Sequence, residues 1–170
     1  PSVKEIVAAF ENLPTDKIII LPNNKNIILA AQNAAKVSVK QITVIPTRNA
    51  PQGFAAMLRL LPEGTLAENE ESMLEAITEV HTGEITTATR DVTIEDVHVE
   101  KNSVIALLDG KLIISTNSVD DALTRLLTAA NVDEYERITL FYGEGMTSPH
   151  VNQLVDKIRK RYPEHEVEVH

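Results

Sequence analysis

The chain has 170 residues, of which 43% are hydrophobic and 24% charged, a balance typical of a soluble globular protein. It has no cysteine, which excludes disulfides, thiolate catalysis and cysteine-based zinc sites. With 25 acidic against 16 basic residues the net charge is −9. The densest basic run, residues 157–161, is typical of a solvated helix face, so we expect no nucleic-acid partner.

The first half of the chain alternates helix patterns with strand patterns. Apolar residues at helical spacing predict helices, and short continuous apolar runs predict strands covered on both faces. We expect Asn23 or Asn24 to cap the second helix, and Asn49 to cap the third, with Pro51 at its first position. The expected elements are a helix over 3–12, a strand over 18–21, a helix over 27–35, a strand over 41–45, and helices over 51–61 and 68–81, the 51–61 helix burying Phe54, Met57, Leu58 and Leu61.

From residue 84 the pattern changes to short threonine-rich and valine-rich strands. Gly83 is expected to end the preceding helix, and Asp109-Gly110 between two apolar runs predicts a hairpin. After residue 115 helix and strand alternate again, beginning with a cap formed by Ser118 and Asp121. The later expected elements are a strand over 138–142, a helix starting at 148–149 and a last strand over 166–170.

This order predicts an α/β fold. We expect a layered, mainly parallel sheet flanked by helices, with an antiparallel β-rich segment inserted at about 84–115. The whole of 1–170 is expected to be a single domain, with its first βα half at 1–81 and its second at 118–170.

Nothing in the sequence predicts a membrane segment or an export signal. No segment reaches the ~20 continuous apolar residues that span a bilayer. The start at Pro1 has no signal-peptide pattern, although a trimmed terminus would look the same. We therefore expect a cytoplasmic protein or a cytoplasmic piece of a longer one.

The polar segments that follow the strands are the candidate binding positions, because open α/β sheets bind ligands at the carboxyl ends of their strands. Asn23 and Asn24 follow one strand, and Arg48, whose guanidinium can hold a phosphate or carboxylate, follows the next. Residues 47–53 are a candidate anion cradle at a helix N-terminus, although the phosphate-loop spacing is missing. The glycines Gly143 and Gly145 follow a later strand without the third glycine of a dinucleotide fingerprint.

No catalytic set emerges from the residue types. The five histidines are scattered, without metal-ligand spacing, and there is no Gly-x-Ser-x-Gly elbow. The sequence therefore predicts binding, with no catalytic residues and no metal site.

The chain resembles the C-terminal region of the catalytic subunit of bacterial fatty-acid kinases, a family related to DegV-like proteins and dihydroxyacetone kinases. The resemblance starts with the run Ile20-Leu21-Pro22-Asn23-Asn24-Lys25-Asn26-Ile27 and is collinear over nearly the whole chain. The other matching segments are 44–48, 51–53, 82–86, 88–91 and 142–144.

The resemblance implies a docking module. In this family a separate N-terminal domain carries ATP and Mg²⁺, so no cofactor is expected in this segment. The C-terminal region is understood to engage an acyl-carrier (fatty-acid-binding) protein whose fatty acid is phosphorylated on its carboxylate. We expect this segment to be non-catalytic and its parent to be an ATP-dependent fatty-acid kinase. The candidate contacts are Asn23, Asn24, Asn26, Thr47, Arg48, Gln52, Gly143 and Glu144.

The chain departs from the family pattern in two places. Glycines that relatives carry near Glu95-Asp96 and near Lys101 are missing, so we expect altered hairpin turns. Relatives continue after the stretch 166–170 with a Gly-Gly-Gln-Pro tail and a further strand. A sheet edge left unpaired by that difference would favour a homodimer.

Two other functions stay open. The first is the substrate domain of a small-molecule kinase of the dihydroxyacetone kinase type, in which a histidine captures the substrate covalently. His81 and His98 lie in the corresponding half of the chain, but neither is in a matching motif. The second is a DegV-like lipid-binding domain, which requires an apolar tunnel.

Overall fold

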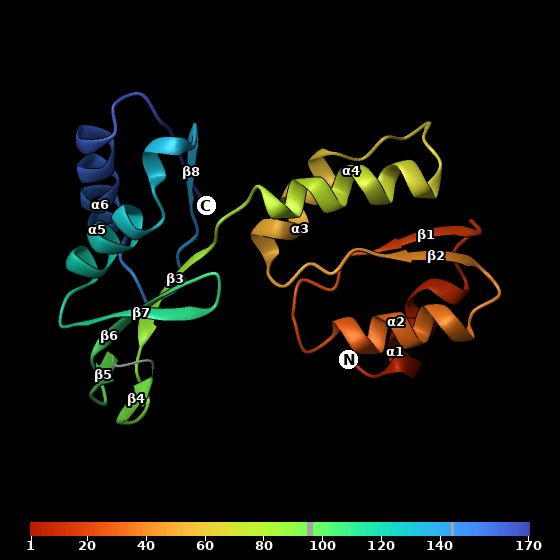
Figure 1. Ribbon diagram of the computed structural model, residues 1–170, viewed down its shortest axis with the longest axis horizontal. Helices are drawn as coiled ribbons and strands as arrows, with labels where there is room; N and C mark the ends of the chain where they lie inside the picture. The colour runs from red at the N-terminus through yellow and green to blue at the C-terminus, as the bar shows by residue number, and fades with distance from the viewer. Residues whose placement is uncertain (95–96, 144) are drawn as a thin grey trace. The chain divides into compact units, whose positions relative to one another are not determined.

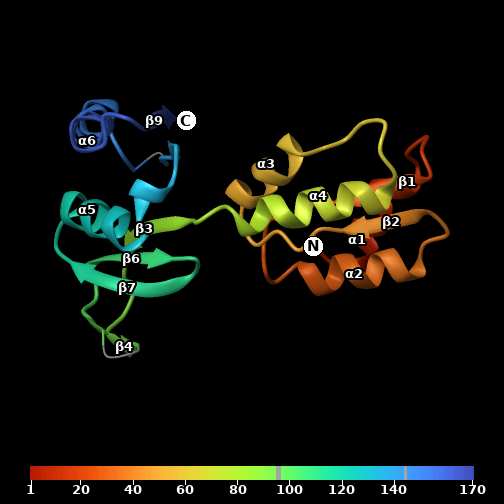
Figure 2. The ribbon, with the colours of Figure 1, turned by 45° about the horizontal axis from the view of Figure 1, so that its top comes forward.

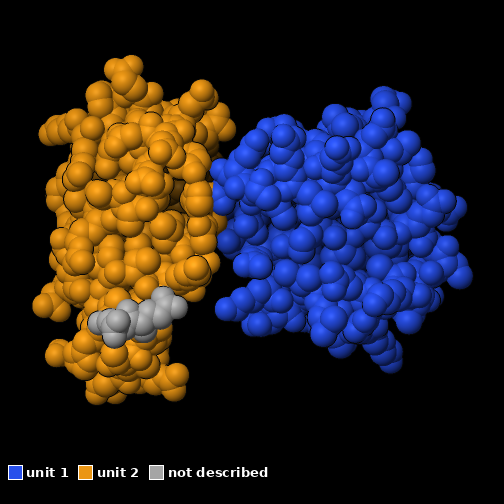
Figure 3. Space-filling model, in the orientation of Figure 1, with its two compact units in different colours: residues 1–80 blue, residues 81–170 orange. Residues whose placement is uncertain are grey.

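The computed structural model describes residues 1–94, 97–143 and 145–170. Its contacts divide the chain into two compact units, residues 1–80 and residues 81–170, which Figure 3 colours blue and orange. The organisation into a single domain stays a prediction.

The first unit is a three-layer sandwich (Figures 1 and 2). Its centre is a parallel strand pair in which Ile18 lies beside Ile42. Helices α1 and α2 cover one face of this pair, and helices α3 and α4 cover the other. The elements are α1 (Val3–Glu11), β1 (Lys17–Ile20), α2 (Ile28–Val37), β2 (Gln41–Val44), α3 (Ala50–Leu58) and α4 (Leu66–Thr78).

Side chains that alternate in direction along β1 contribute to the core on both faces of the strand pair. Ile18 and Ile20 pack into the cluster around Phe10 and Ala34, on the side of α1 and α2. Ile19 and Leu21 pack into the opposite cluster, which contains Ile45, Ala56 and Met73. The continuous apolar run follows from this geometry, because successive residues of a strand point to opposite faces.

The capping of α2 predicted from the sequence is wrong. That helix begins at Ile28, and its N-cap residue Ile27 makes no side-chain capping bond. Asn23 instead adopts a left-handed backbone with φ 53°, and Asn24 Oδ1 accepts a hydrogen bond from the Asn26 N–H at 2.9 Å. Asparagine suits both roles, because its side chain closes local turns and it tolerates a left-handed backbone.

The buried stripe predicted for α3 is also wrong. Phe54, Met57, Leu58 and Leu61 are 54%, 61%, 79% and 45% exposed. The residues that α3 buries are Gly53 and Ala56. Small residues let the helix backbone approach its neighbours closely, and the larger apolar side chains are then left on the other side of the helix.

The second unit contains an antiparallel three-stranded sheet with β6 in the middle. Helix α5 packs on this sheet, where Ala122 and Leu126 meet Ala106 and Ile114. A second antiparallel pair, β4 with β5, packs Val99 against Leu112 of the main sheet. The elements are β3 (Gly83–Thr87), β4 (Val92–Ile94), β5 (Val97–Val99), β6 (Val104–Leu108), β7 (Lys111–Thr116) and α5 (Val119–Ala129).

The end of the chain adds a parallel strand pair and a long helix to this unit. Leu154 and Ile158 of the helix pack against Leu123 and Ile138. The elements are the short 3₁₀ helix η1 (Val132–Glu134), β8 (Arg137–Leu140), α6 (Ser148–Arg161) and β9 (Glu166–Val169).

The α/β class is confirmed, but a layered, mainly parallel sheet is not what the described residues form. Their strands make two separate parallel pairs and two antiparallel sheets. The antiparallel segment expected at about 84–115 is observed between Gly83 and Thr116. Local patterns predict single strands and hairpins, whereas long-range pairing decides how many strands join one sheet.

The turns of the second unit follow backbone preferences. The predicted hairpin at Asp109-Gly110 is present, with φ values of 51° and 80°. Near Lys101, where an altered turn is expected, Asn102 takes the left-handed conformation with φ 71°. The other expected departure, at Glu95 and Asp96, lies outside the described residues. Gly83 does not end a helix, because α4 stops at Thr78 and Gly83 opens β3.

Candidate functional site

The loops after β1 and β2 lie together at one edge of the first unit's strand pair. Both strands run in the same direction, so their carboxyl ends meet at that edge. The pairing continues one step further, where the Ile45 N–H donates to the Ile20 carbonyl at 3.0 Å. Across the loops, the Asn23 N–H donates to Thr47 Oγ1, also at 3.0 Å. The structure therefore brings together residues 20–27 and residues 44–48, two of the segments that carry the family resemblance.

Asn23 and Thr47 have different roles in this contact. Thr47 is fully buried, so its hydroxyl supports the loop from inside. Asn23 is exposed, and its side-chain amide lies against Gly53 of α3. A Cβ at Gly53 would lie 2.2 Å from Asn23 Oδ1, so glycine is required there for this arrangement.

Gln52 ties the second loop to the start of α3. Its Oε1 accepts the Arg48 N–H at 2.8 Å, and its own N–H donates to Asn49 Oδ1 at 3.0 Å. Its Nε2 donates to the Ile77 carbonyl at 3.4 Å. Asn49 is the N-cap of α3, as predicted, and Pro51 in the first turn has no N–H. The N–H groups of Arg48 and Gln52 thus have acceptors within the loop, and the anion cradle at residues 47–53 stays a prediction.

The side chains that remain at the surface of the two loops are amides and cations, without a histidine or a carboxylate. Asn23, Asn24, Asn26 and Arg48 are exposed there, together with Lys25. Neither loop contains a histidine, an aspartate, a glutamate or a serine. The arrangement can recognise a carboxylate or a peptide group, and neither loop supplies the histidine or carboxylate most often used as a general acid or base.

The two remaining candidates, Gly143 and Glu144, belong to the second unit. Gly143 is exposed after β8, and its carbonyl accepts the Met146 N–H at 3.1 Å. Glu144 lies outside the described residues.

A histidine–aspartate pair in the second unit was not predicted from the sequence. His81 Nδ1 lies 2.5 Å from Asp109 Oδ2, and Asp109 Oδ1 accepts the Thr82 N–H at 2.9 Å. The His81 ring meets the Tyr135 ring edge-on at 5.5 Å. The sequence identifies Asp109 as a turn residue and His81 as a lone histidine, because the two residues are 28 positions apart and nothing local indicates their contact.

A second polar cluster joins α5 to α6. The Lys157 ammonium donates to Asp120 Oδ1, and His150 Nε2 lies 3.4 Å from Asp120 Oδ2. The hydrogen bond from Lys157 is the main reason that the pKa of Asp120 is lowered. The contacts join the first turn of α5 to α6, a structural role that requires no ligand.

Two hollows formed by described residues of the second unit have polar or mixed linings, unlike an apolar tunnel. One, of about 510 Å³, is lined mostly by polar residues such as Thr128, Asn131 and Glu134. Another, of about 230 Å³ between α5 and α6, is lined by Leu123 and Leu127 together with charged side chains.

Within residues 1–94, 97–143 and 145–170, no three histidine or carboxylate side chains are grouped to hold a metal ion. Among the described residues, none of the helices combines the length and the apolar composition of a membrane-spanning segment.

Solved structures include a match to this fold. The chain is similar to the Streptococcus pneumoniae fatty acid kinase B3 protein, whose crystal structure was determined loaded with linoleic acid. The TM-score is 0.60, and the match covers 99% of this chain and 69% of the pneumococcal one. Sequence identity is 15%, so this likeness concerns the fold alone.

Comparison of sequences identifies the family of the chain. It is 36% identical to Protein YloV of Bacillus subtilis (strain 168) and 34% identical to an uncharacterized protein of Staphylococcus aureus (strain MRSA252). Both matches cover all 170 residues, which correspond to 31% of each relative's length. The family model for the C-terminal region of FakA-like fatty acid kinase proteins matches residues 1–170. The chain therefore belongs to the FakA-like C-terminal family of fatty acid kinase proteins.

Proposed function

We propose that this chain is the partner-docking domain of a fatty acid kinase, with a fatty-acid-binding protein as its partner. The observation that carries the proposal is the hydrogen bond between Asn23 and Thr47, which joins the loops after β1 and β2. The joined loops present amide, guanidinium and ammonium groups at the surface but no histidine or carboxylate. Such a surface favours recognition over catalysis.

The chemistry of the kinase would then be carried by other parts of the parent protein. The chain spans about a third of the length of the relatives it matches, so most of such a protein lies outside it. We propose that ATP and Mg²⁺ bind there, and that the docked partner presents its fatty-acid carboxylate to that site. The proposal also places the chain in the cytoplasm, where ATP is available.

Isothermal titration of the chain with the linoleic acid-loaded pneumococcal B3 protein tests the proposal, with ATP·Mg²⁺ titrated separately. We expect binding to the loaded protein and none to ATP. Arg48→Ala should weaken the binding about tenfold, as expected for an exposed guanidinium that meets a carboxylate or carbonyl. Binding to ATP alone, or to neither ligand, would contradict the docking function.

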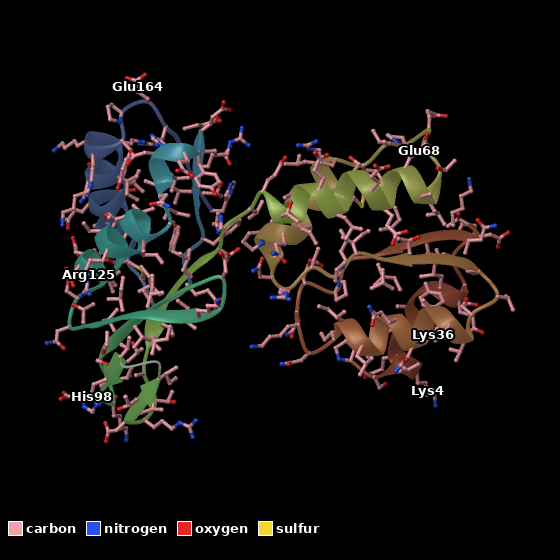
Figure 4. All side chains as sticks on the ribbon, in the orientation of Figure 1. Lys4, Lys36, Glu68, His98, Arg125 and Glu164 are labelled. Atoms are coloured by element: carbon pink, nitrogen blue, oxygen red, sulfur yellow. The ribbon has the colours of Figure 1, made fainter. Side chains whose placement is uncertain are left out.

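The His81–Asp109 pair favours a second candidate function, the substrate domain of a dihydroxyacetone-type kinase. Asp109 contacts Nδ1 of His81, which leaves Nε2 as the nitrogen that could attack a carbonyl carbon. Among the described residues, the polar contact of His98 is with a threonine hydroxyl, Thr93 Oγ1, at 3.3 Å (Figure 4 labels His98). Intact mass spectrometry under native conditions with dihydroxyacetone decides between the candidates. Addition of His81 Nε2 to the carbonyl carbon, with the ring proton passing to the carbonyl oxygen, gives a hemiaminal that adds the full mass of dihydroxyacetone. An adduct that disappears in His81→Gln would support the kinase function.

A further inference from the structure

An exposed apolar surface at the end of α3 is the strongest unassigned feature of the first unit. It consists of Met57, Leu58, Leu60 and Leu61, which are 61%, 79%, 49% and 45% exposed. We call these four residues the α3 apolar face. Large apolar side chains scattered singly are ordinary on a protein surface, but four within five consecutive positions indicate a contact site.

The α3 apolar face is held in place by hydrogen bonds to α4. The buried amide of Asn69 accepts the Leu61 N–H at 2.8 Å and donates to the Leu61 carbonyl at 2.9 Å. Ser72 Oγ donates to the Arg59 carbonyl at 3.2 Å. These bonds fix the backbone that carries the four side chains. Their exposure therefore belongs to an ordered surface, and little entropy is lost when a partner covers it.

Negative charge borders this face. The segment from Glu63 to Glu79 contains six glutamates and no lysine or arginine. Glu71, Glu75 and Glu79 are spaced four residues apart, so they form a row along one side of α4. Arg59 lies between Leu58 and Leu60 in the sequence. Its guanidinium contacts Glu79 at 3.0 Å and Glu75 at 3.9 Å, so this row lies beside the α3 apolar face. One arginine cannot balance the row, so the border stays acidic.

We propose that the α3 apolar face, with its acidic border on α4, binds a protein surface that is apolar at its centre and surrounded by lysine and arginine. The inference rests on the proposed docking function and assigns this surface to the fatty-acid-binding partner. The charge of the border favours a basic occupant, because an acidic surface repels an acidic one and attracts a basic one. The inference therefore requires lysine and arginine around the contact surface of the fatty-acid-binding partner. The helix α3 also begins at the candidate loops and ends at this face, so one partner can contact both.

Binding of the linoleic acid-loaded pneumococcal B3 protein to surface variants of the chain tests the inference. Leu58→Asp should weaken binding by at least about tenfold, since it places a charge at the centre of the contact. The matched control is Leu29→Asp, because Leu29 is 67% exposed on α2, in the layer on the other side of the strands. The control should bind within about twofold of the unchanged chain. Circular dichroism melting of each variant checks that the fold is kept.

Charge reversal tests the acidic border separately. Glu71→Lys with Glu75→Lys should weaken binding by at least about tenfold at low salt, and less at high salt, because salt screens exposed charges. The control pair is Glu11→Lys with Asp16→Lys, near α1. Equal effects of the face variants and their controls would overturn this inference while leaving docking intact, provided that Arg48→Ala still weakens binding. Absence of binding by the unchanged chain would overturn the docking function and the inference together.

Discussion

The backbone conformation of Asn23 connects the two loops of the candidate site. Its left-handed φ of 53° directs its N–H to Thr47 Oγ1, and Thr47 is fully buried. Replacing Thr47 by valine keeps the shape of the side chain but removes the acceptor, which should cost about 1 kcal/mol of stability. We expect the Asn23 amide to exchange faster with deuterated solvent in Thr47→Val and to stay protected in Thr47→Ser. NMR-detected hydrogen exchange measures this, and equal protection in both variants would show that the bond does not hold the loop.

A substitution at Gly53 can distinguish the effect of the loop geometry on partner binding from the effect of helix stability. Alanine favours a helix interior by roughly 1 kcal/mol over glycine, but its Cβ would displace the side chain of Asn23. We therefore expect Gly53→Ala to keep or raise the melting temperature while weakening partner binding several-fold. In an Asn23→Gly background, where no side chain is displaced, the same change should leave binding unaltered. A loss of binding that persists in this background would assign the effect to the helix.

At the scale of elements, the sequence predicted those features that depend on local chemistry. The caps at Asn49 and Ser118 and the Asp109-Gly110 hairpin are present, because each depends on a side chain and its near neighbours. The covered side of α3 could not be predicted in this way. Periodicity shows that Met57 and Leu58 share one side of a helix, but packing through Gly53 and Ala56 turns that side outward. The approach of Asn23 to Thr47 likewise depends on the parallel pairing of strands 24 residues apart.

The capping box of α4 makes the stability of that helix sensitive to acid. Thr65 Oγ1 accepts the Glu68 N–H, and the Glu68 carboxylate accepts the Thr65 N–H at 2.7 Å (Figure 4 labels Glu68). The backbone hydrogen bond from Thr65 lowers the pKa of Glu68, followed by that from its hydroxyl. A lowered folded-state pKa gives stability that is present above the unfolded value of about 4.3 and is lost as the pH falls through the folded value.

Thermal melts of the unchanged chain and of Glu68→Gln, from about pH 6 to about pH 3, measure this effect. Glutamine can still fill the capping position but does not titrate. The unchanged chain should melt higher than the variant at the upper pH, and the difference should shrink as the pH falls below about 4.3. A difference that stays constant over the whole range would mean that the carboxylate charge does not contribute.

At the scale of the whole molecule, the negative charge is unevenly distributed along the sequence. Residues 81–170 carry 16 acidic and 9 basic side chains, whereas residues 1–80 carry 9 acidic and 7 basic ones. The acidic row on α4 is thus a local feature of the less charged unit. A short-range contact at α4 and a long-range field from the whole chain should then affect binding differently, because contacts change dissociation and fields change the rate of encounter.

Stopped-flow association kinetics with the loaded B3 protein can separate these two contributions. We expect the association rate constant to fall about tenfold between about 0.05 M and 0.5 M NaCl, because the Debye length shrinks below the distance over which exposed charges act. Replacing four exposed glutamates of the second unit by glutamine, at positions 84, 100, 134 and 164, should slow association and flatten its salt dependence. Dissociation should stay unchanged in this variant, whereas Leu58→Asp should speed dissociation with little effect on association. If the variant with four glutamines instead dissociates faster, the second unit contacts the partner directly. The docking surface would then extend beyond α3 and α4.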